Sequence, residues 1–562
     1  PYLLSVFSDV RFPRNGEIDD QAGFVLLSMI RKESPDMPLL NLSTDESNRR
    51  KAGKIPAVFL NKNSPSLYSE IQSFFVDHLG FGDFIFRFPD GREIARASNL
   101  RTMEQILPSI PDESVFYHAA HNHFSSWLFA RSEVMLASKL KPVKATEFSS
   151  TEDIKKYLVS CIHERRKGRQ RGIVIDFVPG KFDPDTDFVK VGKGSLGGKA
   201  RGLAFLSALL KGNAELHKKF PSAIVCVPKA FVISTEGYDA FIDQNNFKDL
   251  LGGDINDIRI SKIFLDAKFP DWLERDLELF LAQATYPLAV RSSSLLEDAQ
   301  FQPFAGIYKT YMLPNNHSDE NQRLEQLIMA IKLVYASTYL ETPRSYAKST
   351  LHRIEDEKMA VLIQQLTGSE YGGYFYPTFS GVAQSYNFYP ISQMKPQEGI
   401  VHIAMGLGKT VMEGGKVLRF SPKYPQLLPQ FSTVNDIIRN AQRFFYALKM
   451  DGFPNNFGSV DDATLAKLEI DEVLNHDPVK LLSSTYIPED HRIRDTLMAS
   501  GQPVLTFASI LKYNSFPLPG IVSELLEMGR KGMGGPVEIE FAVNIPLDSR
   551  RKAEFSLLQI RP

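Results

Sequence analysis

The sequence has little cysteine, almost no net charge and no long apolar run. Its 562 residues include two cysteines, Cys161 and Cys226, which excludes a disulfide-stapled scaffold and a zinc site built on four cysteines. Lysine and arginine total 65 against 66 aspartate and glutamate, so the chain is not built to coat nucleic acid or an anionic membrane. No segment approaches the roughly 18 apolar residues of a membrane-spanning helix. With 43% hydrophobic residues, the composition predicts a cytoplasmic multidomain protein whose partners include no nucleic acid and no membrane.

The start of the chain also lacks an initiator methionine and a charged leader. It opens at Pro1 on an apolar run, residues 2–7, so we expect a piece of a longer protein. A prior of about 150 residues per domain predicts three or four domains.

Residues 1–75 alternate strand-like and helix-like patterns. Residues 3–7, 38–42 and 57–60 have the apolar runs of buried strands, and residues 24–30 and 67–76 have helical spacing, with a polar loop at 9–20. Alternation of this kind predicts a parallel α/β sheet.

Three polar side chains follow the predicted strands: Asp9, Ser43 and Lys62. Together with Pro13, four residues after Asp9, they resemble the receiver domain of bacterial response regulators. The resemblance covers about 75 residues and implies that Asp9 is a phosphoacceptor, with Ser43 and Lys62 beside the phosphoryl group. A receiver also needs an acidic pair for Mg²⁺ on a strand that would precede this sequence. The alternative is a receiver-like fold with an inactive site.

Residues 76–182 form an α-rich connector of unknown role. His118, His121 and His123 in it are open to three interpretations: metal ligands, a packed cluster, or a phosphohistidine look-alike at His118. The basic run at 164–171 favours a solvated helix face over a nucleic-acid patch, because acidic residues flank it and no aromatics interleave.

A glycine-rich loop at residues 191–203 carries Lys193 and Lys199 and leads into an apolar helix at 204–210. Backbone N–H groups at a helix start suit a polyphosphate, although the spacing is not that of a Walker A loop. Farther along, a strand delivers Arg291 into a serine-rich turn, and its guanidinium fork suits phosphate oxygens.

The end of the chain predicts two antiparallel strands with chemistry on one face. Alternation at 537–543 places Glu538 and Glu540 together, and alternation at 555–561 places Gln559 and Arg561 together. Carboxylate and amide oxygens suit Mg²⁺, and arginine suits a moving phosphoryl group.

In their order, these segments resemble the ATP-binding domain of pyruvate phosphate dikinase and phosphoenolpyruvate synthase, which has an ATP-grasp-like fold. The resemblance covers about residues 185–562. It implies ATP and Mg²⁺ as cofactors, with catalytic roles for Lys199, Arg291 and Arg561, metal ligation by Glu540 and Gln559, and adenine bound by the backbone after the strand that begins at residue 359. The implied nucleotide-binding residues are Gly197, Gly198, Lys199, Arg291, Ser292, Gln364, Gln365, Leu366, Glu540 and Gln559.

The sequence departs from that family in three places. Lys409 stands where the family has a glutamate after Gly-Leu-Gly, residues 384–390 replace a Thr-Arg-Asn/Asp-Pro motif, and no Gly-Gly-x-x-Ser-His-Ala phosphohistidine signature occurs. Lys409 is a candidate replacement for the lost arginine. A further alternative is that the whole set is ordinary packing in a retired ATP fold.

We therefore expect a multidomain α/β and α+β protein: a receiver-like domain at 1–75 without its N-terminal part, the connector at 76–182, and an ATP-grasp-like domain at 183–562. The expected function is a phosphotransferase module that passes a phosphoryl group from ATP to a histidine or other acceptor, in a domain or protein outside this chain. Its alternatives are a non-catalytic ATP-sensing regulatory protein and, more remotely, an enzyme acting on glucans or small drugs.

Overall fold

The computed structural model divides into two compact units, Pro1–Arg169 and Gln170–Pro562, and each is described by itself. The described residues are 3–14, 16–35, 37–170, 173–179, 182–183, 186–247, 255–294, 308–348, 357–454, 457–458, 462–498, 501–548 and 550–562.

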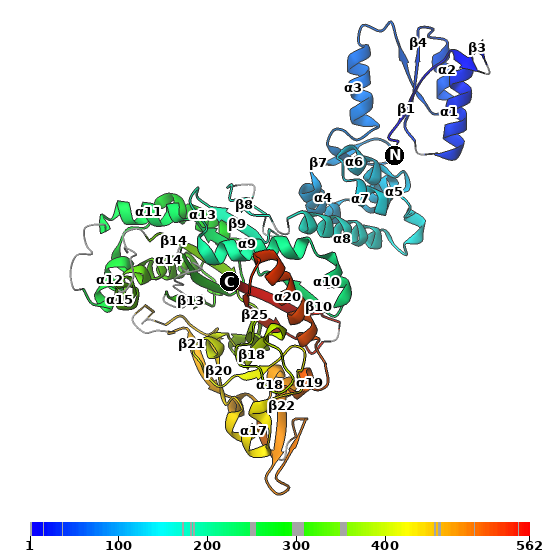
Figure 1. Ribbon diagram of the computed structural model, residues 1–562. Coiled ribbons are helices and arrows are strands. Elements are labelled where there is room, and N and C mark those ends of the chain that lie inside the picture. Colours follow the sequence, from blue (N-terminus) through cyan, green and yellow to red (C-terminus); the bar gives the residue numbers. More distant parts are fainter. Residues whose placement is uncertain are drawn as a thin grey trace. The chain divides into compact units, whose positions relative to one another are not determined.

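The first unit opens with a three-stranded parallel sheet, as the alternating pattern predicts (Figure 1). In spatial order its strands are β1 (Val6–Asp9), β4 (Leu39–Ser43) and β5 (Val58–Asn61), and the accompanying helices are α1 (Ala22–Glu33), α2 (Asn48–Gly53) and α3 (Leu67–Asp77). Successive side chains of β5 point to opposite faces. Phe59 clusters with Phe24 of α1, whereas Leu60 clusters with Phe74 of α3. Helices therefore cover both faces, as is typical of parallel sheets.

Two elements of this region differ from the sequence prediction. The predicted polar loop contains an antiparallel hairpin of β2 (Phe12–Arg14) and β3 (Glu17–Asp19), and α2 occupies a stretch for which no helix was expected. The hairpin strands are three residues long and α2 has six, mostly polar, residues, so neither carries a readable hydrophobic period.

The rest of the first unit is mainly helical. It contains one antiparallel hairpin, β6 (Phe84–Arg87) with β7 (Glu93–Ala97), which the sequence did not reveal. The helices are α4 (Leu100–Ile106), α5 (Asp112–Ala120), α6 (His123–Ala130), α7 (Val134–Leu140) and α8 (Thr151–Gln170). Phe84 stacks on Phe124, and Trp127 packs edge-on against Phe84, so the many aromatic residues of this segment form its core.

The three histidines form a packed cluster. His118 is buried, its Nε2 accepts the backbone N–H of Arg87 at 2.9 Å, and its Nδ1 lies 2.9 Å from Nδ1 of His123. His121 stacks on His123. No group of three or more His, Cys, Asp or Glu side chains placed to hold a metal ion occurs among the described residues. The metal interpretation is therefore wrong, and His118 has both ring nitrogens engaged.

The buried His118 makes the stability of the first unit sensitive to acid. Burial, followed by His123, Arg87 and His121, lowers the pKa of His118 from 6.5 to about 3. The unfolded chain therefore binds this proton more tightly, and stability falls as pH drops from 6.5 toward 3. We expect a loss of roughly 2 kcal/mol between pH 7 and pH 5.

Urea unfolding of a Trp272→Phe variant, followed by fluorescence of Trp127, measures this change. His118→Asn is expected to flatten the pH dependence, and His491→Asn, in an exposed turn of the second unit, should leave it unchanged. A midpoint that does not move between pH 7 and pH 5 would contradict the assignment.

The basic run on α8 is only partly a solvated face. Arg166 is 9% exposed and pairs with Glu104, which also accepts a hydrogen bond from His163 at 2.9 Å. Arg165 pairs with the buried Glu133 at 2.9 Å. A buried arginine needs a carboxylate partner, and two distant acidic residues supply it here, which local composition did not indicate.

The second unit is built on two six-stranded sheets. The first sheet has the order β13 (Thr310–Leu313), β12 (Leu288–Ser294), β14 (Met359–Gln365), β11 (Ala230–Ile233), β9 (Phe188–Val191) and β8 (Ile175–Asp176). The second has the order β10 (Ala223–Cys226), β26 (Ala553–Arg561), β25 (Glu538–Asn544), β17 (Phe379–Gln384), β18 (Ile400–Met405) and β19 (Leu418–Phe420). The predicted central position of β14 is confirmed, since it pairs on both sides.

Helix α9 (Gly197–Lys211) connects the two sheets because it packs against both β12 and β26. A large core joins it to the second sheet and to α20 (Leu518–Met533) through residues such as Leu203, Leu206 and Ile560. A separate core covers the first sheet with α11 (Thr235–Gln244), α12 (Asp257–Asp266), α13 (Asp271–Leu281) and α14 (Glu320–Ala336).

Smaller elements complete the second unit. They are a four-stranded sheet of β15 (Ser369–Tyr371), β16 (Tyr374–Tyr376), β20 (Phe444–Lys449) and β21 (Leu465–Glu469), a three-stranded sheet of β23 (Arg492–Arg494), β22 (Ser483–Ile487) and β24 (Gln502–Leu505), and the helices α10 (Ala214–Lys219), α15 (Glu341–Lys348), α16 (Lys409–Met412), α17 (Val434–Asn440), α18 (Asp477–Leu482) and α19 (Ala508–Leu511).

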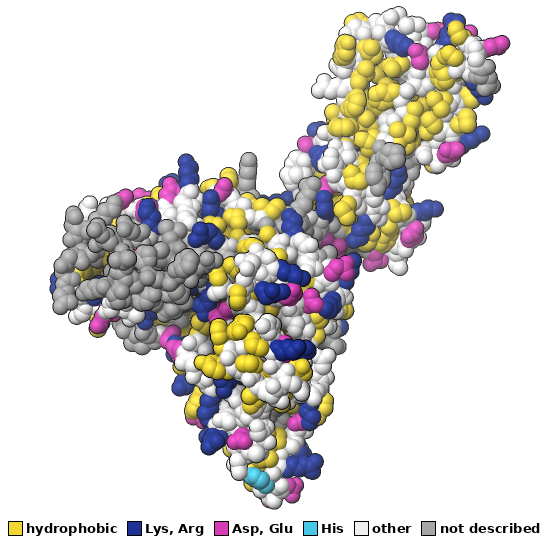
Figure 2. Space-filling model, viewed as in Figure 1, with side chains coloured by type: hydrophobic (Ala, Val, Ile, Leu, Met, Phe, Trp, Pro, Cys, Tyr) yellow, Lys and Arg dark blue, Asp and Glu magenta, His cyan; other side chains and the backbone are white. Residues whose placement is uncertain are grey.

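The surface mixes both signs of charge. On the face shown in Figure 2, basic and acidic side chains of the described residues are interspersed over the second unit, in keeping with the net charge of -1. Within the described ranges, none of the helices has both the length and the apolar character needed to cross a bilayer.

Candidate functional site

The glycine-rich loop ends where α9 docks on β12. Gly197 has φ +73°, and a β-carbon there would lie 1.6 Å from the carbonyl oxygen of Ser293. The Ser293 hydroxyl donates to the carbonyl of Leu196 at 2.8 Å and accepts the backbone N–H of Ala200 at 3.0 Å. Only glycine allows this approach, so the loop is held against the strand that carries Arg291.

Lys199 lies in the first turn of α9 and is 8% exposed. Its Nζ donates to Oγ of Ser292 at 3.1 Å, across the junction of α9 and β12. Ser292 is fully buried. This contact anchors a cationic group at the start of a helix, which is where a phosphate is electrostatically favoured.

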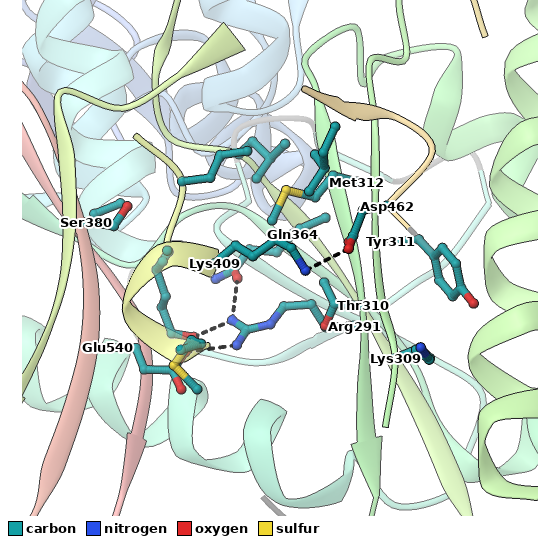
Figure 3. Close-up of a pocket in the computed structure, with 18 of the residues that line it drawn as sticks. Arg291, Lys309, Thr310, Tyr311, Met312, Gln364, Ser380, Lys409, Asp462 and Glu540 are labelled. Atoms are coloured by element: carbon teal, nitrogen blue, oxygen red, sulfur yellow. Dashed lines mark hydrogen bonds and ion pairs between the residues drawn. The ribbon is translucent and has the colours of Figure 1, made fainter. Parts of the chain in front are cut away.

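Arg291 is the centre of the site. Its Nη2 lies 3.1 Å from Oε2 of Glu540 and 3.1 Å from Oε1 of Gln559, both on the second sheet. Its Nη1 donates to the carbonyl of Leu558 at 3.0 Å and, more weakly, to Oε1 of Gln364 at 3.4 Å. Figure 3 shows Arg291 extending from β12 toward Glu540. One guanidinium thus links the two sheets across the space between them.

A β-bulge in β26 allows the carbonyl of Leu558 to contact Arg291. Glu540 pairs with Gln559 and Phe541 with Leu557, so Leu558 is the additional residue. A bulge leaves one residue outside the regular ladder and re-aims its groups. Here the freed carbonyl of Leu558 accepts from Arg291.

The two end strands place their polar side chains as the alternation predicts. Glu538 pairs with Arg561 and Glu540 with Gln559 in the antiparallel register. Nε of Arg561 lies 2.7 Å from Oε1 of Glu538, whose other oxygen accepts from Gln384 at 2.6 Å. Gln559 is 1% exposed.

The site contains a cavity of about 410 Å³, within the size range of ligand pockets. Of the predicted site residues, the cavity is lined by Lys199, Arg291, Gln364, Leu366, Glu540, Gln559 and Arg561. Gly197, Gly198, Ser292 and Gln365 are described but do not line it. Gly197 and Ser292 act instead by positioning the loop and Lys199. Asp9 belongs to the first unit, where its carboxylate contacts Lys62.

Lys409 faces the cavity from the start of α16. Its Nζ lies 2.6 Å from Oδ2 of Asp462 and also pairs with Glu413 (Figure 3). Burial lowers the pKa of Lys409, but the contacts with Asp462 and Glu413 outweigh burial and raise it above the ordinary value. Lys409 therefore lies at the cavity with its charge neutralised by two carboxylates.

Several cavity residues were not among the predicted site residues. Asp462 lies in a loop without a motif, and Thr310 and Met312 lie on the short edge strand β13. Glu538 lies outside this cavity, although it shares a strand face with Glu540 and binds Arg561, which lines the cavity. No local pattern could have found Asp462.

The cavity thus lies between two sheets, with cationic side chains on both walls and the carboxylate of Glu540 and the amide oxygen of Gln559 on one of them. Residues 193–562 match the family described as pyruvate phosphate dikinase, AMP/ATP-binding domain, and the chain belongs to this family.

Two relatives share part of the chain. It is 28% identical over 191 residues to the uncharacterized phosphotransferase YvkC of Bacillus subtilis (strain 168), covering 34% of this chain and 20% of that protein. It is 26% identical over 223 residues to phosphoenolpyruvate synthase of Pseudomonas aeruginosa (strain UCBPP-PA14), covering 36% of this chain and 26% of that protein. The matched regions span about a quarter or less of these longer relatives.

Proposed function

We propose that the second unit is the ATP-binding part of a phosphotransferase and delivers a phosphoryl group to an acceptor outside this chain. In the ATP-grasp-like arrangement that the resemblance implies, ATP lies between the two sheets. The observation that carries the proposal is the convergence of Arg291, Glu540 and Gln559 in the cavity between those sheets. Membership of the dikinase nucleotide-binding family supports it.

The donor set at this point fits Mg²⁺. Glu540 offers a carboxylate and Gln559 an amide oxygen, and both oxygens lie 3.1 Å from the same guanidinium nitrogen. Magnesium is a hard cation that is held by one or two carboxylates together with substrate phosphates and water, so a complete protein cage is not required. When bound, it would neutralise phosphate charge.

Different residues of the chain would then have different roles. Lys199 and Arg291 would hold phosphate oxygens, with the Arg291 fork suited to two of them. Arg561 would stabilise the charge on the phosphoryl group as it moves. Phosphoryl transfer needs mainly positioning and electrostatic stabilisation, which fixed cations supply. The backbone that follows β14, beginning at Leu366, would bind adenine beside the apolar cavity wall that includes Leu366.

Glu540→Gln tests the metal assignment. We expect Mg²⁺-dependent ATP affinity to fall by about tenfold or more, because an anionic ligand is replaced by a neutral one. Calorimetric titration of ATP with and without Mg²⁺ measures this affinity. Glu527→Gln on the exposed face of α20 is the matched control. Equal magnesium dependence in Glu540→Gln and wild type would exclude Glu540 as a ligand.

An ATP-sensing regulatory protein is the competing function. Isotope exchange between ATP and AMP, with Mg²⁺ and candidate acceptors, separates the two. Exchange or acceptor labelling that Arg561→Met abolishes supports the phosphotransferase. Tight ATP binding without any exchange supports the sensor.

We also propose that Asp9, in the receiver-like region at residues 1–75, is a phosphorylation site. Strands β1, β4 and β5 are parallel, so their carboxyl ends, with Asp9, Ser43 and Lys62 beside them, share one edge. Nζ of Lys62 lies 2.5 Å from Oδ2 of Asp9. Where the acidic pair that holds Mg²⁺ is present, acetyl phosphate with Mg²⁺ should add one phosphoryl group at Asp9 and none in Asp9→Asn, as mass spectrometry would show. Labelling that persists in Asp9→Asn would refute this site.

A further inference from the structure

A second cavity adjoins the cavity of about 410 Å³ that we propose to bind ATP, called the ATP cavity below. It lies on the same face of the second sheet. It has a volume of about 530 Å³. Its floor consists of strands β17, β18, β19, β25 and β26, and α16 with the loop after it forms a wall. Met412 and Arg561 line both cavities, so the two share a boundary. We call it the β18 pocket.

One cross-strand row connects the two cavities. Glu540 lies opposite Val382, Val382 opposite His402, and His402 opposite Arg419. Directly opposed residues project from the same sheet face. With strands spaced by about 4.8 Å, His402 is roughly 10 Å from Glu540 along this row.

The β18 pocket is rich in donors and poor in acceptors. Three cationic side chains line it, Lys416, Arg419 and Arg561, against the single carboxylate of Glu538. That carboxylate is already engaged by Arg561 and Gln384. Lys416 donates to the carbonyl of a residue on α17. The excess positive charge favours an anion.

Two of the lining side chains are available to bind one. Neither the His402 ring nor the Arg419 guanidinium hydrogen-bonds or ion-pairs with a residue in the described ranges. The nearby amides are used elsewhere: Gln430 accepts the Arg419 backbone N–H and donates to Val417. His402 is half-buried, and burial followed by Arg419 lowers its pKa.

We propose that the β18 pocket binds a small molecule through an oxyanion group, a phosphate or a carboxylate, held by Arg419 and His402 next to Arg561. A guanidinium fork and an imidazole donor are suited to two oxygens of one such group. The position makes the ligand a candidate phosphoryl acceptor or phosphorylated product. The assignment of the ligand as acceptor or product rests on the proposed function, whereas the anion-binding site itself does not.

Inorganic phosphate is the first probe. It is titrated calorimetrically into the full chain with Mg²⁺ and a non-hydrolysable ATP analogue at saturation, so that the ATP cavity is filled. Arg419→Met is expected to weaken phosphate affinity about tenfold or more, the scale of a lost charge-assisted hydrogen bond. Arg419→Lys should lose less, and His402→Gln should weaken binding severalfold. Arg494→Met, on β23, is the matched control and should behave like wild type.

Acetate, titrated in the same way, distinguishes a carboxylate ligand from a phosphate. Binding of either anion that depends on Arg419 supports the pocket, and the tighter one indicates the ligand class. Equal affinity in Arg419→Met and Arg494→Met would overturn the proposal, as would loss of anion binding once the analogue is bound. Failure of the ATP analogue to bind would count against the proposed function. Phosphate binding that depends on Arg419 in the absence of the analogue would still support the β18 pocket.

Discussion

Arg291→Met is expected to abolish measurable ATP binding and to lower the free energy of unfolding by about 3–5 kcal/mol. Both Arg291 and Glu540 are 13% exposed, so removal of the guanidinium leaves a buried carboxylate without its cation. The carbonyl of Leu558 and the amide oxygen of Gln559 lose a donor at the same time. Urea unfolding and calorimetric titration with ATP measure the two effects.

The double variant Arg291→Met/Glu540→Gln separates stability from function. Removing both charges eliminates the unpaired carboxylate, so the double variant should recover much of the lost stability. It should still fail to bind ATP, because neither the phosphate clamp nor the metal ligand is present. A double variant that regains stability and ATP affinity together would show that Arg291 is structural and not a nucleotide ligand.

Gly197→Ala is expected to destabilise the second unit by about 2–5 kcal/mol. A β-carbon at φ +73° costs roughly 1–2 kcal/mol, and its clash at 1.6 Å with the carbonyl oxygen of Ser293 forces a backbone shift of comparable cost. The shift would move Lys199 away from Ser292, so ATP affinity should fall as well.

Gly212→Ala at the other end of α9 is the matched control. Gly212 has φ −71°, and the nearest atoms to its added β-carbon would be 3.6 and 3.7 Å away, which is ordinary contact. We expect no loss there, or a gain of some tenths of a kcal/mol. Thermal and urea denaturation measure both variants. Similar midpoints for the two would show that the loop does not depend on the close approach at Gly197.

Much of the site was predictable because its signals are local. The period of two along the last strands assigns Glu538 and Glu540 to the same face of one strand, and Gln559 and Arg561 to the same face of the other. This assignment does not depend on the rest of the chain. The same holds for the parallel strands before Asp9, Ser43 and Lys62. Where a segment is short and polar, as in α2 and the β2–β3 hairpin, the hydrophobic period is absent and the element was missed.

What the sequence by itself determined was therefore the type and facing of each long element, and the chemistry at its end. Only the tertiary structure decided which ends meet. Arg291 reaches Glu540 across 249 residues because α9 packs on β12 and β26 together, and the Leu558 bulge turns a carbonyl toward it. The loop carboxylate of Asp462 at Lys409 and the β18 pocket arise in the same way. Contacts of this kind depend on how sheets and loops stack, which no local period encodes.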